Sequence, residues 1–288
     1  MRPPQNPEQN YNAILNSPSY VLPEQDLDLL ARPSLRPIRL QLELLKPELA
    51  LADRGIQSTI VVFGGTQVVE TEEAERRLAR ARAWLEDSPE NPLAKRALQR
   101  AENVAKKSHY YEEARQFARL VSSSTQTNNK SEYVVITGGG PGAMEAANRG
   151  AYDVNAMSIG LNITLPEEQR PNSYITPDLC FQFHYFAIRK MHFLMRAKAL
   201  VVFPGGFGTL DELFEALTLV QTRKMERIPI IMYGRKYWEQ VINFQFLADE
   251  GVIADDHLKL FDFAESPQEC WDLIARFYGD PRAPTART

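Results

Sequence analysis

Glycines gather at three places in this sequence, and each place could bring backbone N–H groups close to an anion. Nine of the fifteen glycines stand within residues 64–65, 138–142 and 205–208. Each cluster directly follows a short apolar run, and the second and third clusters open helical segments. A glycine turn before a helix lets several N–H groups approach a phosphate, and the helix dipole adds about 0.3–2 kcal/mol. Three clusters at equivalent positions favour a phosphate-bearing ligand over turns that are merely tight.

The spacing of the glycines also separates the classes of nucleotide site. No cluster has the Lys-Ser or Lys-Thr that a P-loop requires. The segment GGGPGA at 138–143 is not G-x-G-x-x-G, and the strand-like run at 157–163 has no acidic residue to bind a ribose. The sequence therefore favours a mononucleotide over a dinucleotide cofactor.

Two charged residues near the third cluster could carry out chemistry, although each also has an ordinary structural explanation. Glu212 follows Thr209 in the pattern T-x-x-E, which is also a helix capping box. From spacing alone, Glu212 is as well explained by a cap as by a reactive carboxylate, and Arg189 as well by a surface cation as by a functional one. The histidines show no metal-ligand spacing, and no metal site is expected.

Alternating strand-like and helix-like segments predict the elements that must position these residues. The expected strands are short, rich in β-branched and aromatic residues and apolar on both faces, as buried parallel strands are. They cover residues 58–63, 133–137, 157–163, 179–185, 199–203, 228–233 and 258–263. Helices are expected at 109–121, 142–154, 187–197, 209–222, 235–249 and 266–278. This alternation predicts an α/β fold with a doubly wound, Rossmann-like and mostly parallel sheet.

The remaining segments predict the domain organisation. Residues 1–57 are expected to form a partly disordered N-terminal arm, in which the prolines at 33, 37 and 47 separate short helices. Residues 58–279 form the predicted Rossmann-like nucleotide-binding domain. A charged, Ala-rich helical hairpin interrupts it at 70–107, and the charges of that hairpin are most simply a solvated face. The Pro-rich tail at 280–288 is expected to fray.

The composition excludes several classes of function. The chain has 288 residues, with 33 Lys and Arg against 37 Asp and Glu, so a general nucleic-acid binder is not expected. Its two cysteines cannot form a disulfide framework or a four-ligand zinc site. The N-terminus lacks the apolar core of a signal peptide, and no apolar stretch is long enough to span a membrane. We therefore expect a cytoplasmic protein that binds neither nucleic acid nor membrane.

The run PGGFGTLDE at 204–212 is the most specific motif in the chain. It resembles PGGxGTxxE, the signature of the LONELY GUY family of cytokinin-activating phosphoribohydrolases, many of whose bacterial members carry the older label "possible lysine decarboxylase". The resemblance covers roughly residues 58–278, apart from the hairpin. Its further motifs are RK-x-x-x-x-x-R at 189–196, GGGPGAMEAAN at 138–148 and LPEEQRPNSYIT at 165–176. Arg189 precedes Glu212 by 23 residues, the separation expected of the family's catalytic pair.

This resemblance implies hydrolysis of the N-glycosidic bond of a nucleoside 5′-monophosphate, AMP or an N6-modified AMP, to free base and ribose 5-phosphate. It implies Arg189 and Glu212 as the catalytic residues and requires no cofactor. The residues expected to bind phosphate or ribose are Gly139, Gly140, Lys190, Gly205, Gly206, Gly208 and Thr209. The residues expected at a substrate wall are Glu168, Gln169 and Asn172.

Two other functions compete with this one. A protein of the same fold could bind a nucleotide or cofactor without turnover, but Arg189 and Glu212 would then have no role. A lysine decarboxylase would normally hold pyridoxal phosphate on a Schiff-base lysine, and nothing around Lys190, the only lysine near the glycine turns, resembles that arrangement.

Two features of the sequence concern the nucleobase of the substrate and the oligomeric state of the protein. The first loop, FGGTQ at 63–67, and the hairpin depart from the compact members of the family, which leaves the preferred base open. The segment 209–222 is apolar around much of its circumference, more than one face of a sheet can cover. Because family members also pair across the active site, a homodimer or a larger homo-oligomer is expected.

Overall fold

The computed structural model describes residues 6–126, 131–165 and 170–279. The predicted tail at 280–288 lies outside the described residues. Contacts divide the chain into two units, Met1–Lys46 and Pro47–Thr288, and each is described here by itself. Among the described residues, no helix has the length and apolar character that crossing a bilayer requires.

The described part of the first unit is helical. Helices α1 (Pro7–Leu15) and α2 (Leu27–Ala31) are short, and each begins after a residue whose side chain accepts a backbone hydrogen bond. These two residues are Asn6 and Asp26. Such caps satisfy N–H groups that have no partner within the helix, which explains where the two helices begin.

Helix α3 (Arg36–Asp53) continues through Pro47, so the predicted break at this proline is wrong. An interior proline removes one backbone hydrogen bond and usually costs about 3 kcal/mol. Here Pro47 and Leu51 are buried, and the Glu48 carboxylate binds Arg196 at 2.7 Å. Burial of this turn and its ion pair offset the missing hydrogen bond, so the helix does not end.

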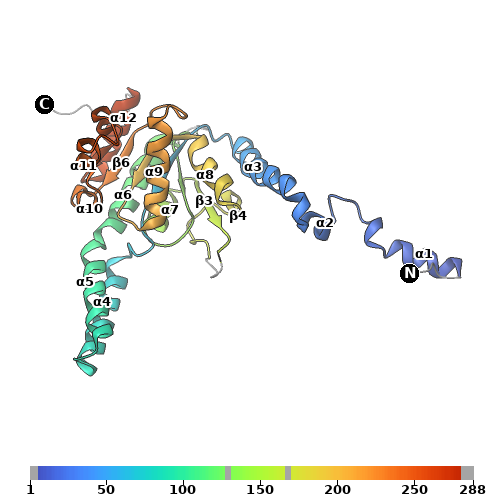
Figure 1. The fold of residues 1–288 in the computed structure, drawn as a ribbon, viewed down its shortest axis with the longest axis horizontal. Coiled ribbons are helices and arrows are strands. Elements are labelled where there is room, and N and C mark those ends of the chain that lie inside the picture. The colour runs from blue at the N-terminus through green and yellow to red at the C-terminus, as the bar shows by residue number, and fades with distance from the viewer. Residues whose placement is uncertain (1–5, 127–130, 166–169, 280–288) are drawn as a thin grey trace. The chain divides into compact units, whose positions relative to one another are not determined.

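Seven parallel strands form one sheet in the second unit, in the order β4-β3-β2-β1-β5-β6-β7. Their bounds are β1 (Thr59–Phe63), β2 (Val134–Thr137), β3 (Ser158–Ile163), β4 (Cys180–Phe183), β5 (Ala197–Val202), β6 (Ile230–Tyr233) and β7 (Asp262–Ala264). Strands β3 and β4, at one end of this order, and β6, near the other end, are labelled in Figure 1. The chain builds the sheet outward from β1, first to one edge and then to the other. The predicted doubly wound α/β class is therefore confirmed.

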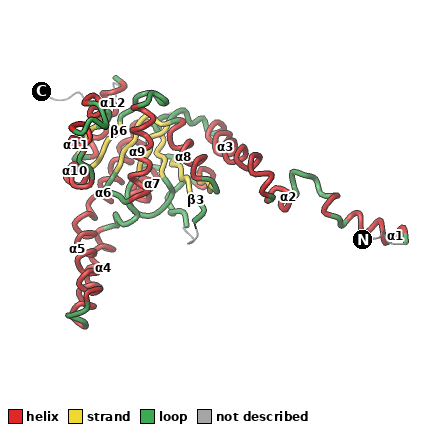
Figure 2. Tube along the Cα trace, viewed as in Figure 1, coloured by secondary structure: helices red, strands yellow, loops and turns green. Residues whose placement is uncertain are grey.

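Helices cover both faces of this sheet (Figure 2). They are α6 (His109–Thr125), α7 (Ala143–Tyr152), α8 (Phe186–Met195), α9 (Phe207–Gln221) and α12 (Pro267–Tyr278). In β1, Val61 and Phe63 belong to the core that includes residues of α8 and α9. Ile60 and Val62 belong to a second core with residues of α6, α7 and α12. The two-residue period of a strand sends neighbouring side chains to opposite faces, which is why both faces are apolar.

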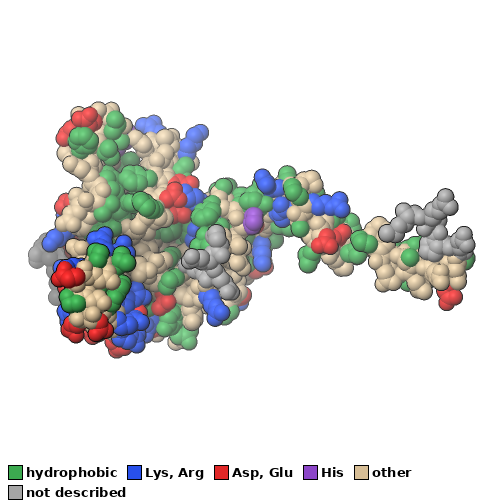
Figure 3. All heavy atoms as spheres, turned by 60° about the horizontal axis from the view of Figure 1, so that its bottom comes forward, with side chains coloured by type: hydrophobic (Ala, Val, Ile, Leu, Met, Phe, Trp, Pro, Cys, Tyr) green, Lys and Arg blue, Asp and Glu red, His purple; other side chains and the backbone are tan. Residues whose placement is uncertain are grey.

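Helices α4 (Thr71–Asp87) and α5 (Pro92–Lys107) pack together as the predicted hairpin. Helix α5 begins after Asn91, whose side chain accepts a hydrogen bond from a backbone N–H. On α4, the Glu73 carboxylate binds Arg77 at 2.7 Å. Figure 3 shows acidic and basic side chains mixed over this part of the surface, as expected of a solvated face.

One predicted helix, at 235–249, is divided in the structure. It forms α10 (Arg235–Val241) and α11 (Phe244–Asp249). The division falls at Asn243, whose side chain accepts a hydrogen bond from the Phe246 N–H at 3.0 Å. Asparagine competes with the helix for backbone donors and so begins a new helix here.

Candidate active site

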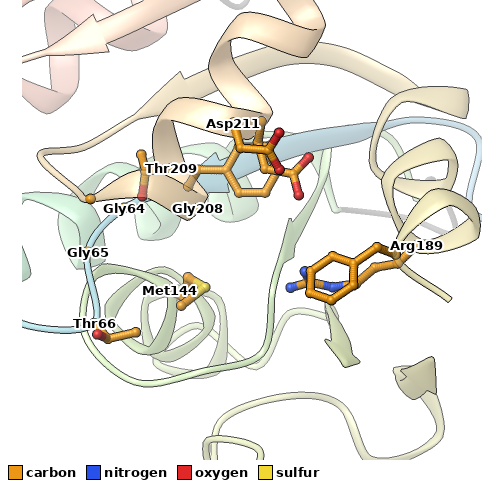
Figure 4. Close-up of a pocket in the computed structure, with 12 residues that line it drawn as sticks. Gly64, Gly65, Thr66, Met144, Arg189, Gly208, Thr209 and Asp211 are labelled. Carbon is orange, nitrogen blue, oxygen red and sulfur yellow. The ribbon is translucent and has the colours of Figure 1, made fainter. Parts of the chain in front are cut away.

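A cavity of about 270 Å³ lies where β1 ends, beside the first turns of α7 and α9 (Figure 4). The loop after β1 contributes Gly64, Gly65 and Thr66 to its lining. Met144 from α7 and Arg189 from α8 line it as well, and α9 supplies the remaining wall. Open α/β sheets bind their ligands at this edge, outside the carboxyl ends of the strands.

Helix α9 begins at Phe207, which places Thr209 third and Glu212 sixth in the helix. A capping box requires the threonine immediately before the helix and the glutamate at its third position. The structure therefore excludes a capping box for this pair. The first N–H groups of a helix have no acceptor within it, and no described side chain caps those of α9.

Glu212 is a buried carboxyl, 8% exposed, in the wall of the cavity. Burial raises the pKa of Glu212 to about 7, and the positive charges of Lys190 and Arg189 oppose this rise only in part. A carboxyl that titrates near neutral pH can take up or release a proton under physiological conditions. Glu212 therefore has the protonation behaviour that a general base or acid needs.

Arg189 extends from α8 into the cavity, across from the start of α9 (Figure 4). Its Nε donates to the Leu161 carbonyl at 2.7 Å. A Cβ atom on Gly138 would lie 2.6 Å from the guanidinium, so the absence of a side chain there lets Arg189 occupy this position. Burial lowers the pKa of Arg189, and the charge of Glu212 opposes the change. The two side chains attract each other without forming an ion pair among the described residues, which leaves room for a ligand between them.

Lys190 does not line this cavity. Its ammonium binds the Asp211 carboxylate at 2.9 Å and the Glu215 carboxylate at 3.0 Å, both on α9. Burial lowers its pKa, and the hydrogen bonds to Asp211 and Glu215 more than compensate, so that the pKa of Lys190 is raised. Lys190 thus joins α8 to α9, and its contact with substrate stays a prediction.

A buried polar network holds the second glycine turn in place. The Asn148 side-chain oxygen accepts from the Thr137 hydroxyl at 2.7 Å and from the Asn172 amide at 3.0 Å. The same Asn172 nitrogen lies 3.2 Å from the carbonyl oxygens of both Gly139 and Gly140. A buried polar group that loses its partner costs about 1–3 kcal/mol. The network therefore fixes the turn beside Arg189, and the role of Asn172 at a substrate wall stays a prediction.

The cavity brings together only part of the predicted site. The predicted residues that line it are Arg189, Gly206, Gly208, Thr209 and Glu212. Gly205 lies behind them, so close to Thr209 that a Cβ atom would stand 2.1 Å from its hydroxyl oxygen. The predicted residues that do not line it are Gly139, Gly140, Asn172 and Lys190. Glu168 and Gln169 lie outside the described residues.

The sequence marked Gly64 and Gly65 as a glycine cluster without assigning them to the site, and it missed five further residues of the lining, which are Phe63, Thr66, Met144, Phe186 and Asp211. Each had a signal in its neighbourhood. Thr66 and Met144 closely follow glycine clusters, and Asp211 adjoins Glu212. Phe186 stands three residues before Arg189, about one helical turn away on the same face of α8.

The polar groups of the cavity could contact a ligand that carries both a phosphate and hydroxyl groups. They are the first N–H groups of α9, the Thr66 and Thr209 hydroxyls, one guanidinium and two carboxyls. Within residues 6–126, 131–165 and 170–279, no group of three or more His, Cys, Asp or Glu could hold a metal ion. The arrangement can bind a phosphate at α9 and hold a sugar between Glu212 and Arg189.

Comparison with known proteins finds a family for the part of the chain that carries most of this cavity. Residues 144–274 match the family described as "Possible lysine decarboxylase". No curated protein matches the chain. Similar solved structures include the molybdenum cofactor binding protein of the phototrophic bacterium Rippkaea orientalis, at 22% identity over 59% of this chain and 88% of that one, with a TM-score of 0.42. Another, named TM1055, is 16% identical over 76% of this chain and 99% of that one, with a TM-score of 0.43.

Proposed function

Residues 144–274 belong to the family described as "Possible lysine decarboxylase", and from this premise we propose that the chain is an N-glycosidase. Its reaction is hydrolysis of a nucleoside 5′-monophosphate, AMP or an N6-modified AMP, to free base and ribose 5-phosphate. The observation that carries this proposal is the pairing of buried Glu212 with Arg189 across one cavity at the start of α9. We also propose a cytoplasmic location and no cofactor.

The 5′-phosphate binds at the first turn of α9 in this proposal. The backbone N–H groups of Phe207, Gly208 and Thr209 lie at the positive end of the helix dipole, which favours an anion. The phosphate takes no part in the bond that breaks. Its binding energy instead positions the sugar, so that C1′ lies beside Glu212.

Glu212 acts as the catalytic carboxylate. In its ionised form it accepts a proton from the attacking water and stabilises the positive charge that develops on the sugar. The water oxygen forms a bond to C1′ while the bond from C1′ to the base nitrogen breaks. The electron pair of that bond leaves with the base. The base takes up one proton, equivalent to the proton that Glu212 accepted and then gives up, and the sugar product keeps its phosphate.

Arg189 contributes a fixed positive charge opposite Glu212. Its Nε is held by the Leu161 carbonyl, which leaves the terminal nitrogens for the substrate. A guanidinium can donate two parallel hydrogen bonds to phosphate or ribose oxygens. Arg189 therefore orients the sugar phosphate and does not exchange protons.

The reaction named in the family's description suits this cavity less well. Lysine decarboxylation with pyridoxal phosphate requires a lysine that forms a Schiff base within the site. In the described part of the chain no lysine lines this cavity, and Lys190 is bound by two carboxylates. Incubation with lysine should therefore release no carbon dioxide.

We expect AMP to be hydrolysed to adenine, and adenosine to react with a kcat/KM at least about 100-fold lower. Adenosine lacks the phosphate that α9 binds, so its sugar is not positioned, and the lost binding energy appears in turnover as well as in affinity. Mass spectrometry of released adenine on equal concentrations of the two compounds measures the difference. Equal rates would contradict a phosphate site at α9 while leaving the glycosidase reaction standing.

We expect the protein to be at least a homodimer. Phe207 is 92% exposed and Phe214 is 40% exposed, and both residues of α9 line the same surface depression. Large apolar side chains grouped on one surface favour contact with a partner. Light scattering at micromolar concentration should give at least twice the chain mass, and Phe214→Asp should reduce it. Phe246→Asp, a change of a similarly exposed phenylalanine on α11, is the matched control, and a monomeric wild type would refute the expectation.

A further inference from the structure

A second cavity adjoins the candidate active site on the other side of the glycine turns. Its volume is about 650 Å³, and Gly65, Thr66 and Gly206 line both cavities. We call it the hairpin groove, because its opposite wall is helix α5. A ligand bound at the start of α9 therefore lies next to this groove.

The hairpin groove is positively charged. Arg96, Arg100, Asn103 and Lys107 line it, at spacings of four, three and four residues. These spacings put the four side chains on one face of α5. No Asp or Glu lines the groove, and none of its three cations forms an ion pair with a described residue. Three like charges facing one cavity repel each other unless an anion lies among them.

The base of the hairpin is attached to the turn that carries the proposed phosphate site. The Lys107 ammonium lies 6.0 Å from the centre of the Tyr237 ring, and the Tyr237 hydroxyl donates to the Gly205 carbonyl at 2.7 Å. On the other arm of the hairpin, Arg77 donates to the Gln67 side chain at 2.9 Å. These contacts hold the cationic face of α5 toward the glycine turns.

We infer that the hairpin groove binds a phosphate group in addition to the one at α9. The proposed function supplies the identity of the first ligand, a nucleoside 5′-monophosphate, and the inference rests on it to that extent. The additional phosphate either continues the same nucleotide, as in a nucleoside diphosphate, or belongs to a separate molecule. In both cases Arg96 and Arg100 donate charge-assisted hydrogen bonds to it.

The test measures calorimetric binding of AMP, ADP and inorganic pyrophosphate in a Glu212→Gln background. This background prevents turnover if the proposed function is right and leaves binding measurable if it is wrong. The groove variant is Arg96→Gln with Arg100→Gln. Glutamine keeps the helix propensity of these exposed positions, so α5 should remain folded. Arg82→Gln with Lys106→Gln removes two charges from exposed positions of the same hairpin that do not line the groove and serves as the matched control.

ADP is expected to bind at least about fivefold more tightly than AMP, and the groove variant should lose about tenfold in ADP affinity with little change for AMP. The control variant should still bind ADP more tightly than AMP. If ADP shows no preference, but pyrophosphate binds beside saturating AMP and loses affinity in the groove variant, the phosphate belongs to a separate molecule.

Two results would overturn the inference. In the first, the groove variant binds ADP and pyrophosphate as tightly as the protein with an intact groove. In the second, the control variant loses as much affinity for these ligands as the groove variant. Adenine release by the wild-type protein is measured separately. A failure to hydrolyse AMP therefore refutes the proposed function but not the inferred phosphate site in the groove. A failure of the groove to bind phosphate likewise leaves the proposed function standing.

Discussion

Glu212→Gln should lower the turnover of AMP by about 100-fold or more while leaving the protein folded and able to bind AMP. Glutamine keeps the shape of the side chain but cannot accept a proton or balance positive charge on the sugar. Because Glu212 is not part of a capping box, this change removes no helix cap. Adenine release and AMP affinity, measured on one preparation, give the two quantities that separate turnover from binding.

The pH profile provides an independent check on the same residue. Burial raises the pKa of Glu212 to about 7, so the ionised form becomes dominant only above that pH. The wild-type kcat/KM should therefore rise with pH through about 7, since this parameter reports the pKa values of the free enzyme. The residual activity of Glu212→Gln should lack this rise.

The free energy of unfolding should fall as pH rises, whereas kcat/KM should rise. A carboxyl whose pKa is higher in the folded protein than in the unfolded chain stabilises the fold while it is protonated, below about pH 4.5, and this stabilisation is lost as pH rises through about 7. The loss amounts to about 3 kcal/mol on the order-of-magnitude scale of 1.36 kcal/mol per pKa unit. Glu212→Gln is therefore expected to gain melting temperature relative to wild type between pH 5 and pH 8.

Glu215→Gln is the matched control, since it lies on the same helix and does not line the candidate active site. It should keep turnover within about threefold, because it loses only one of the two carboxylates that hold Lys190. Near-normal turnover by Glu212→Gln would contradict the proposed mechanism, whatever the family. A large loss in both variants would point to a general disturbance of α9.

Arg189→Ala should also lose about 100-fold in kcat/KM, with much of the loss in kcat. The alanine removes the positive charge that faces Glu212 and the hydrogen bonds to the sugar phosphate. Arg189→Lys should recover little, because an ammonium cannot reproduce the two-pronged geometry of a guanidinium. Steady-state kinetics on AMP measure both variants.

The pKa of Glu212 provides a further readout for Arg189. The Arg189 charge lowers that pKa, so its removal should shift the acid limb of the kcat/KM profile to higher pH. Arg119→Ala, at an exposed position on α6, is the control and should change neither quantity. Full activity of Arg189→Ala would remove this residue from the mechanism and leave Glu212 without its proposed partner.

The sequence by itself determined the class of fold, and it predicted the edge of the sheet at which the proposed site lies. Short apolar runs alternating with amphipathic ones are local patterns, and they predicted the seven strands and the hairpin. Glycines after β1, β2 and β5 marked the edge at which we propose that the ligand binds, since a tight turn at a strand end is also a local property. The resemblance built on the motif at 204–212 is confirmed by the family match over residues 144–274.

Some sequence patterns allow two structural explanations, and only the tertiary structure decided between them. Thr209 and Glu212 have the spacing of a capping box, yet the helix begins at Phe207, so the box does not exist. The break expected at Pro47 is absent because contacts distant in sequence bury that turn.

The chemistry of the site also depends on distant parts of the chain. Glu212 titrates near neutral pH because neighbouring elements bury it, and the Arg189 guanidinium occupies its place in the cavity wall beside Gly138, where a side chain would crowd it. The charges of α5 could not be assigned to a cavity until the hairpin was placed against the glycine turns. Periodicity fixes which residues share a face of a helix or strand, whereas what that face meets is set by packing between segments far apart in sequence.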